Sequence, residues 1–218
     1  MAGDRVDGRA LIEVMTTRRS TREGFTREPI AEADLRAILA AGLAAPSSKN
    51  AQPWRFHVVR SPDALAAVAD AAVHEDARNA EDFVPLDPTT GRPHTRWSST
   101  VVESADVLRH APVGIFIENR GEFSHDRASV AAADDVTAAV LTYSLELLGV
   151  GAAIENLLLA AGALGLGAVF IGDILVAEPV IREQLGLDGD LVGVVAIGHG
   201  ATPTAPRPVH GDRVVWHS

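Results

Sequence analysis

APSSKNAQPWRF, the stretch from Ala45 to Phe56, joins an apolar helical pattern to a run of β-type residues. Its two prolines, Pro46 and Pro53, each fix φ and remove a backbone donor, so the connection is expected to be stiff. The short polar side chains between the prolines are Ser47, Ser48, Asn50 and Gln52. They can donate and accept hydrogen bonds in several directions, which suits a polar heteroaromatic ligand. The same residue types also build ordinary loops, so this stretch alone leaves both interpretations open.

A second motif, RRSTR at Arg18–Arg22, follows a short helical pattern that spans Ala10–Thr17. A surface cation at a helix C-terminus contributes only about 0.3–1 kcal/mol. Compensation of the helix dipole therefore does not explain three arginines within five residues. The planar guanidinium group is a natural match for phosphate. Anion binding is therefore the favoured interpretation of this cluster, and a solvated face is the alternative.

The two motifs together, RRSTR with Phe25 and then APSS.N.QPW.F, resemble the FMN-dependent nitroreductase family. AAIENLLLAAGALGLGAVFIG, at Ala152–Gly172, fits the same family, and the resemblance runs from about Met15 to Arg207. It implies an α+β fold with a small central mixed β-sheet surrounded by helices. It also implies an intertwined homodimer that exchanges its C-terminal tail and holds two FMN sites at its interface.

The resemblance further implies a set of cofactor-binding residues: Arg18, Arg19, Ser20, Arg22, Pro46, Ser47, Ser48, Asn50, Gln52, Ile171, Gly172 and Arg207. Residues 18–20 would hold the FMN phosphate and ribityl chain, and Arg22 would reach the pyrimidine edge of the ring. Residues 46–50 resemble the segment that is contributed across the dimer interface. The turn at Gly172 resembles the one whose backbone N–H meets flavin N5, and Arg207 resembles a late basic residue at the phosphate.

The implied activity is that of an FMN oxidoreductase with a ping-pong mechanism. NADH or NADPH would reduce the flavin, and a small acceptor such as a nitroaromatic or a quinone would then take the electrons at the same face. No side chain is assigned a catalytic role, because the flavin supplies the electron-transfer chemistry. The polar and basic pair that family members often carry in mid-chain cannot be placed between Asn79 and Arg109. Two alternatives therefore stay open: a flavin-binding or storage protein without turnover, and a specialised flavoenzyme for dehalogenation, flavin breakdown or peptide-ring dehydrogenation.

Length and composition exclude several other classes of protein. The 218 residues, 47% hydrophobic and 22% charged, predict a single domain over residues 1–218 with one sizeable core. The formal net charge of −10 argues against nucleic-acid binding. The chain has no cysteine, and its histidines lack ligand spacing, so neither disulfides nor a metal site is expected. The N-terminus has no apolar signal region, and Val136–Ile171 is interpreted as a buried helix and strand rather than a membrane span, so a cytoplasmic protein is expected.

Two polar excursions, at about residues 74–99 and 119–131, interrupt the predicted helices and strands. Long loops of this kind are usually functional or mobile, and we interpret both as lids whose apolar side chains are Phe83, Trp97 and Phe123. A disordered insertion is the alternative for the first. A C-terminal arm, about residues 199–218, ends in an apolar tip that suits strand exchange between protomers.

Overall fold

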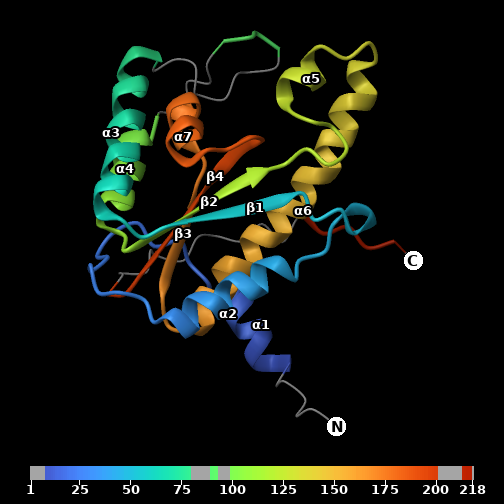
Figure 1. Ribbon diagram of the computed structural model, residues 1–218. Helices are drawn as coiled ribbons and strands as arrows, with labels where there is room; N and C mark the ends of the chain where they lie inside the picture. Colours follow the sequence, from blue (N-terminus) through green and yellow to red (C-terminus); the bar gives the residue numbers. More distant parts are fainter. Residues whose placement is uncertain (1–7, 80–88, 93–98, 201–212, 218) are drawn as a thin grey trace.

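The structure is a computed structural model that describes residues 8–79, 89–92, 99–200 and 213–217. Its centre is a four-stranded sheet in the order β1-β2-β4-β3. The strands are β1 (Trp54–Val59), β2 (Val113–Asn119), β3 (Gly167–Ile171) and β4 (Asp190–Gly198). Figure 1 shows helices on both faces of this sheet, which confirms the predicted α+β fold with a small sheet surrounded by helices.

The expected mixed pairing is wrong for the described strands, because every neighbouring pair is antiparallel. The strands β2 and β3 do run in the same direction, but β4 lies between them and opposes both. Two helices, α3 and α4, lie between β1 and β2 in the chain, and because these strands pair antiparallel the end of β1 lies beside the start of β2, with Val59 opposite Gly114.

The sheet separates two hydrophobic cores. One face packs against α2 (Glu32–Leu43) and α6 (Val136–Ala163), and the other against α3 (Pro62–Asn79), α4 (Val101–His110) and α7 (Glu178–Leu185). Every residue of β2 is buried, and successive side chains alternate between the cores. Thus Ile115 and Ile117 belong to the α2–α6 core, whereas Phe116 belongs to the core beneath α3 and α4.

The helix α6 is one continuous helix of 28 residues and β3 follows it, in agreement with the helix and strand expected over Val136–Ile171. Gly149 and Gly151 cost helix propensity, but packing against the sheet overrides that cost. By length and composition α6 could cross a membrane, yet a core helix passes the same test. Its buried residues are Glu146, Gly149, Val150, Ala153, Ile154, Leu157, Leu158 and Ala161. They form one stripe toward the sheet and α2, which supports the interpretation as a core helix.

Both predicted excursions contain helix. The helix α3 continues to Asn79, so residues 74–79 of the first predicted excursion are helical although most of them are polar. The helix α4 was not predicted at all, and the short helix α5 (Arg127–Ala131) lies within the second excursion. Phe83 and Trp97 lie outside the described residues.

A buried carboxylate holds the turn that precedes α5. Glu146 on α6 accepts hydrogen bonds from the backbone N–H of Phe123 at 2.6 Å, from the hydroxyl of Ser124, and from Asn119 Nδ2 at 3.3 Å. Phe123 itself is 39% exposed. The second excursion is therefore a built turn with an aromatic side chain at its surface, and its role as a lid stays a prediction.

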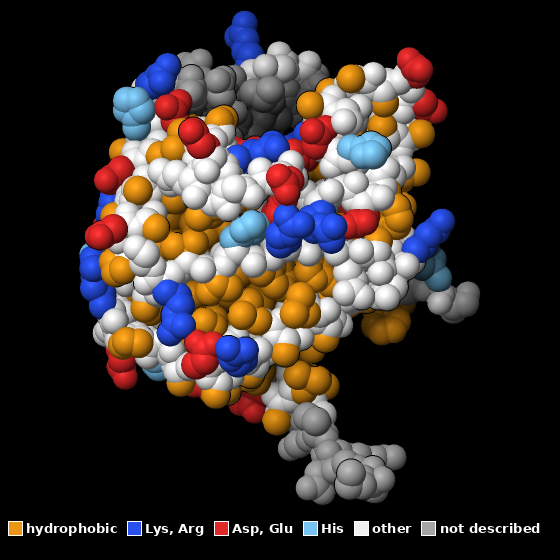
Figure 2. Space-filling model, viewed as in Figure 1, with side chains coloured by type: hydrophobic (Ala, Val, Ile, Leu, Met, Phe, Trp, Pro, Cys, Tyr) orange, Lys and Arg blue, Asp and Glu red, His pale blue; other side chains and the backbone are white. Residues whose placement is uncertain are grey.

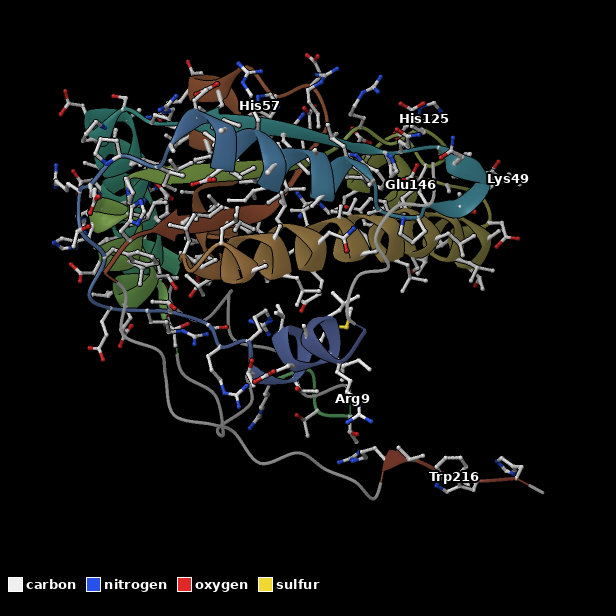
Figure 3. The ribbon with its side chains drawn as sticks, turned by 90° about the horizontal axis from the view of Figure 1, so that it is seen from below. Arg9, Lys49, His57, His125, Glu146 and Trp216 are labelled. Atoms are coloured by element: carbon white, nitrogen blue, oxygen red, sulfur yellow. The ribbon has the colours of Figure 1, made fainter. Side chains whose placement is uncertain are left out.

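Both ends of the described chain lie away from the cores. The helix α1 (Gly8–Thr17) has no buried residue, and Figure 3 shows it set apart from the rest of the fold, below α6. Near the C-terminus Trp216 is 90% exposed and stands clear of the fold in the same view. Exchange of the C-terminal tail stays a prediction, and Arg207 lies outside the described residues.

Candidate functional site

The basic segment that follows α1 runs beside the edge strand β3. Arg18 continues the helix by donating its N–H to the carbonyl of Val14, at 3.0 Å. Three residues later Thr21, which is buried, donates its N–H to the carbonyl of Ala168 on β3, at 3.0 Å. The chain is thereby held against β3, so that Arg18 lies near α6 and Arg22 lies near the far end of the strand.

Arg18 has an unused donor. Its Nε lies 3.0 Å from Glu155 Oε1 on α6, which fixes the plane of the guanidinium group. Its Nη1 is buried and has no hydrogen-bond partner among the described residues. A cavity of about 290 Å³ lies beside it, between the end of α1, the end of α6 and the start of β3. A buried guanidinium donor without an acceptor is unfavourable unless an anion or another acceptor binds there.

Arg19 behaves differently from Arg18. Its Nη1 donates to the carbonyls of Thr16, at 3.1 Å, and Arg18, at 2.7 Å. These bonds satisfy carbonyl groups at the end of α1, as expected of a basic residue at a helix C-terminus. In this chain Arg19 therefore closes the helix, while Ser20 is half-buried next to it.

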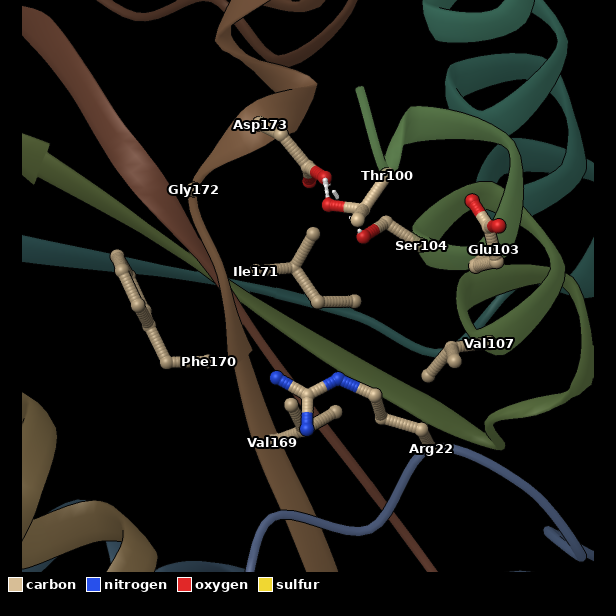
Figure 4. Close-up of a pocket in the computed structure, with 10 residues that line it drawn as sticks. All are labelled: Arg22, Thr100, Glu103, Ser104, Val107, Val169, Phe170, Ile171, Gly172 and Asp173. Atoms are coloured by element: carbon tan, nitrogen blue, oxygen red, sulfur yellow. Dashed lines mark hydrogen bonds between the residues drawn. The ribbon is translucent and has the colours of Figure 1, made fainter. Parts of the chain in front are cut away.

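Another cavity, at the end of β3, has a volume of about 450 Å³. Figure 4 shows its walls, formed by the Arg22 side chain, the end of β3 and the start of α4. The lining residues are Arg22, Thr100, Glu103, Ser104, Val107, Val169, Phe170, Ile171, Gly172 and Asp173. Its size lies within the range of about 300–1,000 Å³ that is usual for small-molecule pockets. Apolar walls with a few polar groups suit a flat ring system that has polar edges.

Gly172, at the end of β3, leaves room for a ligand. Its φ of −104° is accessible to any residue, so the backbone does not require glycine there. A methyl group added to Gly172 would lie 3.4 Å and 3.8 Å from two atoms of the Phe170 ring, which are ordinary contacts. Nothing within the described chain explains the missing side chain, whereas close approach of a ligand to this backbone would.

The connection at residues 45–53 is held by its own hydrogen bonds. The N–H of Gln52 donates to Ser47 Oγ at 2.9 Å, and Gln52 Nε2 donates to Asn50 Oδ1 at 3.0 Å. Lys49, Asn50 and Gln52 have φ values of 50°, 55° and 49°, in the left-handed region that non-glycine residues rarely occupy. Such strain is found most often at functional sites. The side chains of Pro46 and Asn50 are exposed, and the stiffness of the connection stays a prediction.

Within one chain, the connection and the arginine segment contact different parts of α6. Ser47 packs on Gly149, where an added Cβ would lie 3.1 Å from Ser47 Cβ, whereas Arg18 pairs with Glu155. An α-helix turns about 100° per residue, so positions 149 and 155 face directions about 120° apart and lie about 9 Å apart along the axis. Neither cavity near Arg18 and Arg22 is lined by any of residues 46–52. Figure 3 likewise shows Lys49 at one extreme end of the molecule.

Sequence reasoning missed four polar residues of the larger cavity, Thr100, Glu103, Ser104 and Asp173, and hydrogen bonds join three of them. Asp173 Oδ2 accepts hydrogen bonds from Thr100 Oγ1 at 2.7 Å and from Ser104 Oγ at 2.9 Å, and dashed lines mark these bonds in Figure 4. Thr100 and Ser104 belong to the unpredicted start of α4. The spacing of Val101, Ala105 and Leu108, all buried, could have revealed that helix.

A second polar cavity, of about 310 Å³, lies where β1 and β2 meet the turn before β4 and is best explained as structural. Its centre is the buried Glu118, which lies 2.8 Å from His57 Nε2, accepts the backbone N–H of Gly189 at 2.6 Å, and faces Arg55 at 3.4 Å. Burial alone would raise the pKa of Glu118, but these hydrogen bonds and charges outweigh burial and lower the pKa below its ordinary value. Figure 2 shows basic, acidic and His side chains gathered in a band above a region of hydrophobic side chains.

Among the residues that the structure describes, no group of His, Asp and Glu side chains could hold a metal ion. The candidate site is the pair of cavities beside Arg18 and Arg22: the first offers a buried guanidinium donor, and the second offers a guanidinium together with hydroxyl and carboxylate groups.

Comparison with known proteins points the same way. The sequence model of the Nitroreductase family matches residues 15–199. A protein of Archaeoglobus fulgidus, provisionally named NADH dehydrogenase/NAD(P)H nitroreductase, is 28% identical over 193 residues, which cover 86% of this chain and 84% of that protein.

Two solved structures share the fold. A provisionally named nitroreductase from Desulfovibrio desulfuricans, solved in complex with FMN, is 26% identical, with a TM-score of 0.64 and coverage of 95% of this chain and 96% of that one. A nitroreductase with bound FMN from Desulfitobacterium hafniense is 19% identical, with a TM-score of 0.70 and coverage of 95% and 98%.

Proposed function

Because the chain belongs to the nitroreductase family, we propose that it is an FMN-dependent oxidoreductase that uses NADH or NADPH as its reductant. FMN is bound to two of the similar proteins, and a nicotinamide reductant is in the name of a third. When bound, FMN supplies the redox chemistry, taking electrons from the nicotinamide and passing them to a second small molecule.

One observation carries this proposal: the buried Nη1 of Arg18, without a partner among the described residues, beside a cavity. A phosphate group would satisfy that donor with a charge-assisted hydrogen bond. Arg22 and the bare backbone of Gly172 line the neighbouring, larger cavity, where a flat ring with carbonyl edges fits the mixture of apolar walls and donors. The residues present therefore fit FMN, with Arg18 and Ser20 toward its phosphate and Arg22 and Gly172 toward its ring.

The physiological acceptor is proposed as a class only. Nitroaromatics and quinones are the default acceptors by family likeness. They would bind where the nicotinamide binds, each in turn, which gives a ping-pong mechanism. No described side chain needs to act as an acid or base for this role, and the work of the protein is to bind and orient the flavin and to exclude water from it.

We propose that the working form is a cytoplasmic homodimer. The outer face of α6 carries exposed apolar side chains, of which Leu148 is 71% exposed, and α1 exposes Leu11, Ile12 and Met15. An exposed apolar surface of this extent favours contact with another protein. A second copy would also bring its own residues 46–52, which lie far from Arg18 within one chain, to the flavin.

A spectrum and a reduction assay test the proposed function. Purified protein should be yellow, and anaerobic NADH or NADPH should bleach its flavin absorbance. Addition of a nitroaromatic or a quinone should restore the oxidised spectrum through many turnovers per flavin. Colourless protein that takes up no FMN would refute the proposal. Bound FMN that neither nicotinamide reduces would instead favour a flavin-binding protein without turnover.

A further inference from the structure

Asp173 carries a buried acceptor that the fold does not use. Its Oδ1 is buried and has no hydrogen-bond partner among the described residues, whereas Oδ2 accepts from two hydroxyl groups, those of Thr100 and Ser104. The two hydroxyls approach the same oxygen, at 2.7 Å and 2.9 Å, and so fix the orientation of the carboxylate. A buried carboxylate oxygen without a donor is costly, so this geometry points to a missing donor.

The surroundings of Asp173 specify the chemistry of that donor. Asp173 lines the cavity of about 450 Å³ together with Arg22, a second carboxylate, Glu103, and the hydroxyl residues Thr100 and Ser104, and the rest of the wall is apolar. A ligand that satisfies both residues presents an N–H group to Asp173 and a carbonyl oxygen to Arg22. An imide edge has an N–H flanked by two carbonyls and offers both groups within one flat ring. The pyrimidine part of a flavin ends in such an edge.

We propose that Asp173 accepts a hydrogen bond from the imide N3–H of the flavin, and that Thr100 and Ser104 are positioning residues for this contact. The proposal rests on the proposed function, because it requires FMN to be the ligand. The polar and basic pair that family members often carry in mid-chain could not be placed in this sequence. The proposal gives its role to Asp173, with Thr100 and Ser104 in support. It also makes the pocket specific for rings that carry a free imide hydrogen.

The test compares FMN with its 3-methyl analogue, in which a methyl group replaces the imide hydrogen. Full-length protein freed of flavin is titrated with each compound, and binding is followed by quenching of flavin fluorescence. A hydrogen bond to a charged acceptor is lost with the methyl group, so the wild type should prefer FMN by about ten- to a hundred-fold. In Asp173→Ala that preference should shrink to a few-fold, and FMN itself should bind about ten- to a hundred-fold more weakly.

Two further variants separate recognition from a merely structural role. Asp173→Asn keeps an acceptor oxygen and should retain most of the preference for FMN, and its flavin reduction potential should rise because a negative charge beside the ring has been removed. A Thr100→Val, Ser104→Ala double variant keeps Oδ1 but frees it to move, and its preference for FMN should be intermediate.

The possible results are distinguishable. Wild-type protein that binds FMN and its 3-methyl analogue equally would overturn the assignment of Asp173 while leaving the proposed function intact. If Asp173→Ala lowered stability but kept the full preference, Asp173 would only tether β3 to α4, and the assignment would also fail. Wild-type protein that binds no flavin would overturn both proposals together.

Discussion

Arg18 illustrates, at the scale of one residue, how a carboxylate can orient a guanidinium group and leave one buried donor without a partner among the described residues. Glu155 holds its guanidinium from one side, at 3.0 Å, and thereby leaves Nη1 directed into buried space. Arg19, its neighbour in sequence, donates hydrogen bonds to carbonyl groups at the end of α1. Adjacent residues of the same type therefore have separate roles, which only their hydrogen-bond partners reveal.

Substitution Arg18→Ala tests this role. Loss of a charge-assisted contact to phosphate should weaken FMN binding by about ten- to a hundred-fold, which corresponds to about 1.5–3 kcal/mol. Isothermal titration of flavin-free protein measures this. The control is Arg36→Ala, since Arg36 is 76% exposed in a surface pair with Glu32 and its loss should change stability within about 0.5 kcal/mol. Equal flavin affinity in the wild type and Arg18→Ala would show that Arg18 does not bind the phosphate.

Gly172→Ala is a second test at this scale. The added methyl group meets only ordinary contacts with Phe170, so the melting temperature without flavin should stay almost unchanged. The methyl group would intrude between the backbone and the flavin ring, and FMN should bind at least about ten-fold more weakly. Gly186→Ala should do the reverse: φ at Gly186 is 64°, so stability should fall by about 1–2 kcal/mol with flavin affinity retained. If Gly172→Ala bound FMN with full affinity, the flavin ring would not lie against the backbone of residue 172.

At the scale of helices and strands, the sequence predicted the elements whose apolar periodicity is strong and missed those built on polar residues. The stretch Ala45–Phe56 joins the helix α2 to the strand β1, and Val136–Ile171 forms the helix α6 and the strand β3, as their apolar patterns predicted. The end of α3 and all of α4 were missed because polar side chains obscure the apolar pattern there. One of these polar residues, Asp76 of α3, is buried and accepts a hydrogen bond from Ser99. The contact between Asp173 and Thr100 joins residues far apart in sequence, so no local signal could have predicted it.

Glu118 joins β1 and β2 to the turn before β4 and predicts a pH dependence of stability. Its pKa is lower in the folded protein than the ordinary value of 4.5, so the fold favours the charged form. Its contribution is therefore fully present above pH 4.5 and is lost as the pH falls through the lower, folded value.

Urea unfolding at a series of pH values measures the effect. Glu118→Gln should be less stable than the wild type near neutral pH, and the difference should narrow as the pH falls below 4.5. Glu183→Gln, at an exposed position of α7, is the matched control and should follow the wild type. A constant difference between Glu118→Gln and wild type across the whole pH range would contradict a role for the charge.

At the scale of the whole molecule, many of the exposed apolar side chains lie on α6 and α1, the elements that we propose face a second chain. Leu141, Leu145 and Leu148 form a stripe along α6 opposite its buried face, and both α1 and the residues near Trp216 add apolar surface. An apolar helix face of this length is rarely left in water. The family resemblance had implied a dimer, and these exposed side chains give it a physical reason.

Leu148→Asp tests whether this face is the interface. A charge placed in a closed apolar contact costs several kcal/mol, so the dimer should dissociate at micromolar concentration and lose its flavin. Sedimentation equilibrium measures the mass. The control is Val102→Asp on α4, where a similarly exposed apolar side chain, 57% exposed, lies outside this stripe. If the Leu148→Asp protein remained dimeric, the dimer interface would have to lie on another part of the surface.

The central claim is that each flavin site combines Arg18 of one chain with the connection at residues 45–53 of the other. Subunit complementation tests it. Arg18→Ala removes the proposed phosphate contact, and Asn50→Gly removes the Asn50 side chain without adding strain, because glycine accepts the φ of 55°. Each variant alone should bind FMN weakly at both sites of its dimer.

The decisive measurement is the number of tight FMN sites after the two variants are mixed and their subunits exchange. In a heterodimer one shared site carries both defects and the other carries none. Half of the dimers are then mixed, so about a quarter of all sites should recover wild-type affinity. If each site were built from a single chain, every site would keep one defect, and a flavin titration that finds no tight sites in the mixture would contradict the account.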